Sequence, residues 1–283
     1  MAVGEQQQLK LRLASDTTDL LAAQRLRYRI FYDELGAKPD LLTEVSGLDC
    51  DRFDAICDHL LVIDEHREEP SDTDVKDGKV IGTYRLLRHD IALQHGGFYS
   101  QSEYDLDPLF ARHRDLRLLE VGRSCVAKDY RGTAVAELLW QGIWDYVRAH
   151  GMTAMTGCAS LAGTEPDLLA DELSFLAHHA SAPPEWRVNA LAERYVALER
   201  KPLAMIDQRA VLRRLPTLIK GYLRLGAYVG DGAVIDWQFN TTDVLILLPV
   251  SRINPKYLAY YDAPALASKS SNRGEVENVI GGR

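Results

Sequence analysis

Residues 118–132 read LLEVGRSCVAKDYRG and lie at the centre of the predicted fold. The first nine are mostly apolar, with Glu120 and Arg123 set among them, which predicts a strand that carries a carboxylate and a guanidinium. A basic turn with Gly132 follows, and apolar residues then recur at helical spacing over 134–150. Because the first turn of a helix has unpaired N–H groups and the positive end of the helix dipole, this strand–turn–helix unit suits a bound phosphate group.

The composition predicts a globular chain that does not bind nucleic acid. With 283 residues and 46% hydrophobic content, the chain can bury a large core, either as one domain or as one domain with an insertion. A formal net charge of −8 argues against general nucleic-acid binding. Neither a bilayer-spanning apolar run nor a basic-then-apolar leader is visible, so we expect a cytoplasmic protein.

The remaining pattern alternates strands and helices, and Pro216 is expected to kink the last helix or to start a new one. We expect strands over 9–13, 58–63, 79–88, 152–160, 233–239 and 244–250, and helices over 17–35, 168–179 and 207–224. Residues 37–48 and 226–232 are expected to be irregular, and residues 89–110 are expected to be loop with short helical pieces. This order predicts an α/β fold with a mixed sheet that is antiparallel at its start.

The domain organisation is expected to be simple. Residues 1–8 and 263–283 are predicted to be flexible tails, around one domain over 9–262. Residues of about 166–204 are predicted to form a helical insertion in that domain.

We expect neither a metal site nor a disulfide. The four cysteines form no C-x-x-C pair, so buried reduced thiols are expected. The adjacent residues His178 and His179 have no carboxylate at ligand spacing, which favours a structural role.

The element order, with a strand, a basic glycine turn and a helix at its middle, resembles the GNAT acyltransferase fold. That fold has a mixed, largely antiparallel central sheet flanked by helices. The turn after its fourth strand binds the pyrophosphate or phosphopantetheine arm of a thioester donor. The resemblance therefore implies that Arg131, Gly132 and Thr133 hold the phosphate of a donor arm.

Longer segments narrow the resemblance. Arg27-x-x-x-Phe31, Asp51-x-x-Asp54 and Glu120-x-x-Arg123 look like motifs of the acyl-homoserine-lactone synthases, which are distantly similar. The segments YRIFYDELGA, FDAICDHLLV, GTYRLLR, GGFYSQSEYDL, GCASLAGT and FNTTDV look like the L-ornithine Nα-acyltransferases over residues of about 20–260.

This resemblance implies a reaction and its partners. The enzyme would transfer a 3-hydroxyacyl chain from acyl carrier protein to the α-amino group of L-ornithine, giving lyso-ornithine lipid. The donor would be the phosphopantetheine arm of the carrier, with no permanently bound cofactor. Because the product is a single-chain amphiphile, we also expect loose association with a membrane surface.

The chemistry suggests candidate catalytic residues. Amide formation requires a neutral amine, and Glu120 is the first candidate to accept its proton, directly or through water. Asp51 and Asp54 would bind the amine as a cation or share the role of base, and Arg123 belongs to the same catalytic group. The structural alternative is that Asp54, Arg85, Glu120 and Arg123 form an ion-pair network that braces the sheet.

Further candidates would bind substrate. Arg27 or Arg85 would hold the ornithine α-carboxylate bidentately, and Phe31 would form the wall of the site. Backbone N–H groups near Ser124 and Cys125 would polarise the thioester carbonyl.

A basic face would dock the acidic carrier protein, and the alternative is a solvated helix face. It comprises Arg209, Arg213, Lys220 and Arg224.

Two other functions stay open at this stage. One is N-acylation of a different amine, such as glutamine, glycine, lysine or a homoserine-derived substrate. The other is a non-catalytic module that binds acyl carrier protein or lipid.

Overall fold

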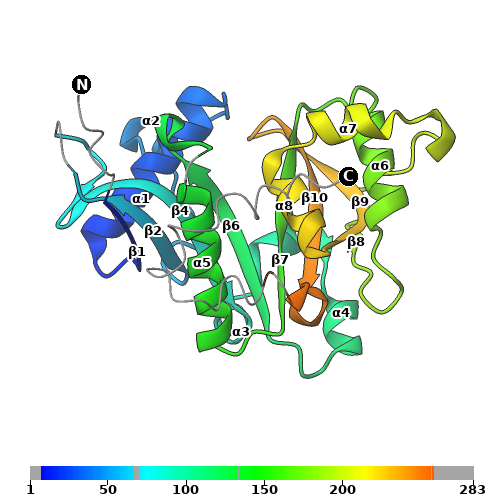
Figure 1. Cartoon of the computed structure of the whole chain (residues 1–283), viewed down its shortest axis with the longest axis horizontal. Helices are drawn as coiled ribbons and strands as arrows, with labels where there is room; N and C mark the ends of the chain where they lie inside the picture. The colour runs from blue at the N-terminus through cyan, green and yellow to red at the C-terminus, as the bar shows by residue number, and fades with distance from the viewer. Residues whose placement is uncertain (1–7, 67–69, 133, 256, 258–283) are drawn as a thin grey trace.

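The computed structural model describes residues 8–66, 70–132, 134–255 and 257, whose arrangement is shown in Figure 1. In these residues a mixed ten-stranded sheet has the order β1-β2-β4-β6-β7-β10-β9-β8-β5, with β3 paired to β4. Helices flank this sheet, so the predicted α/β, GNAT-like class is confirmed. Apart from Gln8, both predicted tails and the predicted domain end at 262 lie outside the described residues.

The first half of the sheet is antiparallel and packs between two helices. Its main strands are β1 (Leu9–Leu13), β2 (Asp58–Asp64), β4 (Gly78–Arg88) and β6 (Leu118–Val126), with the short β3 (Asp74–Val75) at its edge. Leu60 and Val62 pack with α5 (Ala134–Ala149), whereas Leu61 and Ile63 pack with α1 (Thr17–Tyr28). Strand β2 is therefore apolar on both faces, as strands covered on both sides are.

The second half of the sheet is also largely antiparallel. It contains β7 (Ala154–Ala162), β10 (Thr241–Pro249), β9 (Tyr228–Asp236), β8 (Asn189–Ala190) and β5 (Tyr104–Asp105). The larger helices of this half are α6 (Ala170–Ala180), α7 (Gln208–Arg214) and α8 (Thr217–Leu225). The described residues also contain the short α-helices α2 (Leu41–Ser46), α3 (His89–Gln94) and α4 (Asp107–Arg112). None of the described helices is long and apolar enough to cross a bilayer.

The structure corrects several predicted elements. Pro216 separates α7 from α8, which is one of its two predicted effects, because proline cannot donate the hydrogen bond that would continue one helix. The expected loop over 226–232 contains the start of β9, and the stretch over 37–48 contains α2. Residues 181–202, predicted to be helical, are irregular apart from β8, because isolated contacts with the sheet replace helical hydrogen bonds. Of the four thiols only Cys125 is buried, and Cys50 is exposed.

The two halves meet where β6 and β7 separate. These strands pair in parallel at Leu118↔Ala154, Leu119↔Met155 and Glu120↔Thr156, and no further pairs follow in the described residues. Gly157 permits this contact, because a Cβ there would lie 2.2 Å from the Val121 carbonyl oxygen. In Figure 1 the strands lie together at one end and move apart toward the other.

A bulge in β6 accompanies the separation. Thr83 pairs with Cys125 and Arg85 pairs with Gly122, so two residues of β6, Arg123 and Ser124, lie opposite Tyr84 alone. Arg123 has φ of 49°, in the left-handed region that bulges can impose on a side-chain-bearing residue. The bulge turns backbone and side-chain groups of β6 toward the gap.

Candidate active site

A cavity of about 450 Å³ occupies the gap between β6 and β7. One part of its wall is apolar and aromatic, including Tyr84, Leu218 and Tyr222. The other part is charged, including Arg85, Arg123 and Asp243. Such a cavity can hold a molecule that has both a long apolar part and a charged head.

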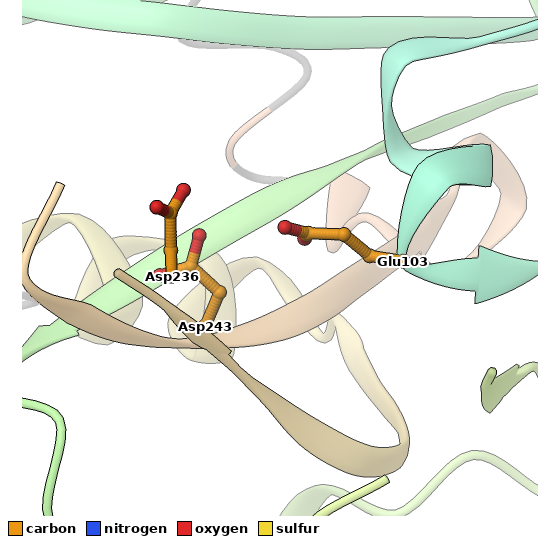
Figure 2. A group of neighbouring side chains, drawn as sticks. All are labelled: Glu103, Asp236 and Asp243. Atoms are coloured by element: carbon orange, nitrogen blue, oxygen red, sulfur yellow. The ribbon is translucent and has the colours of Figure 1, made fainter. Parts of the chain in front are cut away.

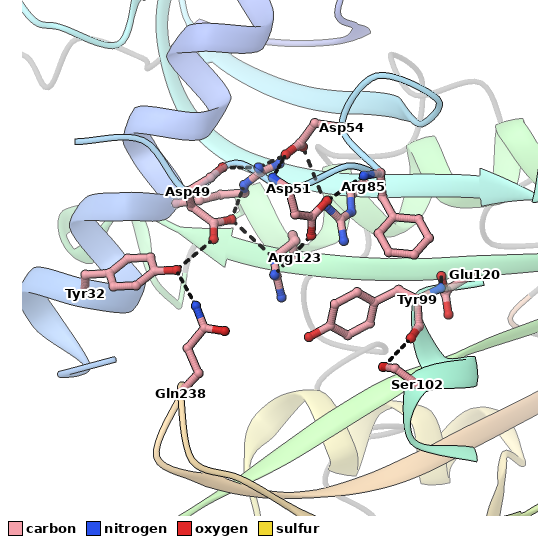
Figure 3. Close-up of polar contacts among 12 residues, drawn as sticks. Tyr32, Asp49, Asp51, Asp54, Arg85, Tyr99, Ser102, Glu120, Arg123 and Gln238 are labelled. Atoms are coloured by element: carbon pink, nitrogen blue, oxygen red, sulfur yellow. Dashed lines mark hydrogen bonds and ion pairs between the residues drawn. The ribbon is translucent and has the colours of Figure 1, made fainter. Parts of the chain in front are cut away.

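A closed ion network stands behind the charged wall (Figure 3). The Arg27 guanidinium donates to Asp49 at 2.7 Å and to Asp54 at 2.8 Å. Arg85 lies 2.7 Å from Asp51 and 3.6 Å from Asp54. Three arginines, including Arg123, thus face three aspartates, and their formal charges cancel.

The network joins the first helix to the loop that precedes β2. Arg27 on α1 is completely buried and also donates to the backbone carbonyl of Asp49. Burial opposes ionisation of Asp54, but the charges of Arg27 and Arg85 outweigh it and hold the pKa of this carboxyl below its usual value. Asp54 is therefore an ionised counterion of Arg27 and Arg85 at neutral pH.

Arg123 is held where the network meets the cavity. Its guanidinium carbon lies 5.0 Å from the Tyr99 ring centroid and 4.7 Å from that of Phe239. The same group lies 3.2 Å from Asp49 and 3.3 Å from Asp51. In Figure 3 its terminal nitrogens extend past these aspartates toward Tyr99. Arg123 is therefore a fixed cation that a ligand carboxylate can reach.

Glu120 lies deeper in the wall and anchors a turn. Its carboxylate accepts hydrogen bonds from the backbone N–H of Tyr99 at 2.9 Å, and from the N–H and hydroxyl of Ser100 at 2.9 and 2.6 Å. Burial raises the pKa of Glu120 although these donors oppose the shift. Glu120 lines the cavity, so it combines a structural role with access to a ligand.

A second acidic group lies in the same part of the molecule, and the sequence reasoning missed it (Figure 2). One carboxylate oxygen from each of Glu103, Asp236 and Asp243 lies within 4.8 Å of the others. Asp236 and Asp243 line the cavity. The available signal was an acidic residue within an apolar strand, as Asp243 is within TTDVLILLP.

Comparison with known proteins identifies the family. The chain is 48% identical over 257 residues to the L-ornithine Nα-acyltransferase of Brucella abortus, covering 91% of this chain and 90% of that protein. It is 46% identical to the enzyme of that name from Agrobacterium fabrum, covering 91% and 86%, and 43% identical to that from Rhodobacter capsulatus, covering 89% and 94%. The chain belongs to the L-ornithine Nα-acyltransferase family. Residues 26–141 also match the model of the acetyltransferase (GNAT) domain.

In this member of the L-ornithine Nα-acyltransferase family, the cavity gathers part of the predicted site. Five predicted residues line it, namely Phe31, Arg85, Glu120, Arg123 and Ser124. Arg27, Asp51 and Asp54 lie in the network and do not line the cavity. Cys125 is also outside the lining, because its side chain packs in the core beneath α1. Burial raises the pKa of this thiol to about 12, so it stays protonated.

The predicted phosphate cradle lies at the start of α5. Arg131 forms an ion pair with Glu34 and donates from Nε to the carbonyl of Val126 at 3.0 Å. Gly132 has φ of 74°, and Thr133 lies outside the described residues. His178 donates from Nε2 to the backbone carbonyl oxygen of Lys201 at 3.0 Å, because a carbonyl oxygen can only accept.

We predict that Arg27→Met destabilises this member of the family by about 3–5 kcal/mol, because removing one side of a buried ion pair leaves the other side uncompensated. Chemical denaturation measures the loss. Arg29→Met is the matched control, since Arg29 forms a partly exposed pair with Asp72 and should cost about 0–1 kcal/mol. Equal losses of unfolding free energy in both variants would show that the buried Arg27 network stabilises the fold no more than an exposed ion pair does.

Proposed function

We propose that the protein transfers a 3-hydroxyacyl chain from acyl carrier protein to the α-amino group of L-ornithine. The observation that carries the proposal is the coincidence of family membership with a cavity that opens between β6 and β7. An apolar wall suits the acyl chain, and a wall with a fixed arginine suits the acceptor amino acid. No covalent nucleophile is required for this reaction.

The ornithine α-carboxylate would bind Arg123, with Arg85 beside it. Both line the cavity, and guanidinium groups bind carboxylates with two parallel hydrogen bonds. Arg27, the other candidate from the sequence, would instead position Asp49 and Asp54, because its guanidinium is buried behind them. Asp51 and Asp54 would likewise hold the arginines rather than take a proton.

Glu120 would accept the proton of the α-amine through a water molecule. Three protein donors already occupy much of its carboxylate, which favours a relayed over a direct transfer. Its raised pKa makes it a stronger base than an exposed glutamate. The expelled thiolate of the phosphopantetheine arm would take up a proton at the end of the reaction.

The donor would approach from the start of α5. The bulge at Arg123 and Ser124 leaves strand backbone without its regular partner, and a free N–H there would polarise the thioester carbonyl. Arg131, Gly132 and Thr133 would hold the phosphate of the arm, with Arg131 leaving Glu34 to do so.

The first experiment measures thiol release from 3-hydroxyacyl carrier protein across a panel of amines, with mass analysis of the products. Ornithine, lysine, glutamine, glycine and homoserine lactone form the panel, and 3-hydroxyacyl-CoA is the alternative donor. Release that depends on ornithine supports the proposal. Release with another amine keeps the reaction type and changes the acceptor. Absence of release with every amine would favour the binding-module function.

We predict that Glu120→Gln lowers kcat by about 100-fold or more, because the variant cannot accept the proton of the amine. Steady-state kinetics with ornithine measure the effect. Ser100→Ala is the control, since it removes the 2.6 Å hydrogen bond to Glu120 and leaves the carboxylate in place. If Ser100→Ala loses as much activity as Glu120→Gln, then Glu120 acts by anchoring the turn and not as a base.

The carrier protein would dock on the basic surface of α7 and α8. Lys220 and Arg224 line a groove of about 570 Å³ together with Arg252, while Arg209 and Arg213 lie exposed on α7. In the described part of the chain none of these cations lies within ion-pair distance of a carboxylate. An acidic carrier would supply the missing negative charge.

We predict that reversing charge in Arg213→Glu with Lys220→Glu raises the KM for carrier protein roughly 10-fold and leaves the KM for ornithine unchanged. Kinetics at low ionic strength measure both constants. Arg114→Glu, in the exposed turn before β6, is the control with one reversed charge elsewhere. An unchanged KM for the carrier would place its docking site on another surface.

A membrane surface would receive the lipid product at α2. Leu41, Leu42 and Val45 are 74%, 80% and 79% exposed, and Trp237 is 64% exposed. The two segments are joined by a hydrogen bond from the Lys38 N–H to the Gln238 carbonyl. Large apolar side chains gathered on a surface indicate a contact site, and a tryptophan among them suits a membrane interface.

We predict that Leu42→Glu with Val45→Glu reduces sedimentation with phosphatidylethanolamine–phosphatidylglycerol vesicles by about tenfold or more, because two apolar contacts with the bilayer are lost. Lys38→Glu serves as a control for charge at the same surface. Binding equal to that of the unmodified protein would contradict a membrane contact at α2.

A further inference from the structure

The acidic group formed by Glu103, Asp236 and Asp243 lies at the charged end of the cavity, apart from the arginine network. The three residues come from different segments: Glu103 from the turn before β5, Asp236 from the end of β9 and Asp243 from the start of β10. Figure 2 shows Asp236 and Asp243 side by side, with the Glu103 carboxylate pointing toward them. The fold therefore brings three negative groups together at a place that a ligand can reach.

The protein places a cation beside only one member of this acidic group. Asp243 accepts from the Thr241 hydroxyl at 2.8 Å, and Asp236 accepts from the N–H groups of Gln238 and Phe239, all of which are neutral donors. Arg194 lies 3.4 Å from Glu103. In the part of the chain that the structure describes, neither Asp236 nor Asp243 has a lysine or arginine within ion-pair distance.

This imbalance affects proton affinity. Burial, followed by the charge of Asp243, raises the pKa of Glu103 to about 7. Burial also raises the pKa of Asp243 to about 6. Carboxylates so close together in a buried site are stabilised by a cation that enters from the cavity. The arginine network, where the charges cancel, has no such need.

A second, independent observation indicates that the cavity holds a polar ligand. Tyr84 is 3% exposed and lines the same cavity, and its hydroxyl lies near those of Ser124 and Tyr222 without a hydrogen bond of standard geometry to a described residue. A buried hydroxyl without a partner costs free energy, and a bound molecule can provide that partner. The cavity thus offers a ligand the Tyr84 hydroxyl in addition to the acidic group.

Ornithine carries charges opposite to those of Arg123 and of the acidic group. Its α-carboxylate matches Arg123, and its side-chain ammonium is a cation that takes no part in the reaction. Arg123 and Asp243 line the same cavity. A short amino acid with charged groups at both ends can therefore reach both walls at once.

We propose that Glu103, Asp236 and Asp243 form the subsite for the side-chain ammonium of the acceptor, and that this subsite selects ornithine over amino acids with uncharged side chains. The inference rests on the proposed function and deepens it. Asp243 and Asp236 contact the ammonium, and Glu103 supports them from behind. The subsite also fixes the α-amine relative to the gap between β6 and β7, where the thioester carbonyl lies.

The test compares L-ornithine with L-norvaline, which is ornithine without the terminal amine. For the unmodified protein we expect kcat/KM to favour ornithine strongly. In Asp243→Asn we expect kcat/KM for ornithine to fall by about 10–100-fold, the size expected for a lost charged hydrogen bond, while that for norvaline stays within about twofold. Asp231→Asn, on β9 but outside the cavity lining, should leave the ratio unchanged.

Several outcomes would overturn the proposal. If Asp243→Asn keeps the preference for ornithine, the subsite is wrong while the proposed function stands. If the unmodified protein releases no thiol with any of the amines, the proposed function fails and the subsite fails with it. If EDTA removes the preference for ornithine, the acidic group holds a divalent cation instead.

A second variant and a direct measurement guard against misfolding. Asp236→Asn removes an equivalent charge at the end of β9, and we expect the same loss of selectivity for ornithine. Calorimetric titration of the unmodified protein with ornithine and norvaline reports binding without turnover. Equal affinities for both amino acids would also overturn the proposal.

Discussion

The separation of β6 from β7 is the constraint on which the site depends. The strands pair over three residues and then part. Gly157 allows their close approach at Val121, and the bulge at Arg123 redirects β6 beyond that point. Backbone groups that would otherwise pair become available to a ligand. The cavity, the exposed strand backbone and the position of Arg123 are all consequences of this separation.

Charge is arranged differently on the two sides of this gap. The network of Arg27, Arg85 and Arg123 with three aspartates is neutral as a whole, so the aspartates offset the cost of desolvating the arginines and hold Arg123 beside the cavity. The acidic group at Asp243 is left with excess negative charge. A balanced wall positions a substrate group, whereas an unbalanced wall attracts one.

Glu120 belongs both to the support of the site and to its lining. Its carboxylate anchors the turn at Tyr99 and Ser100, and Tyr99 in turn packs against the Arg123 guanidinium. The same residue therefore shapes the cavity wall and remains within its lining. The anchoring role and the role as a base differ in what they require, because Glu120→Gln removes the carboxylate whereas Ser100→Ala removes only one of its hydrogen bonds.

Local sequence patterns determined the fold class, the central strand and helix, and the charged motifs that surround them. Arg27, Glu120 and Arg123 were recognisable because charged residues in apolar segments need partners. Which of them reaches a ligand was decided by tertiary structure: Arg27 is enclosed by two aspartates, and Arg123 faces the cavity. Glu103 lies 140 residues before Asp243 in the chain, and no local pattern connects it with Asp236 and Asp243. Strand order brings them together, because β9 and β10 pair while β5 joins the sheet through β8.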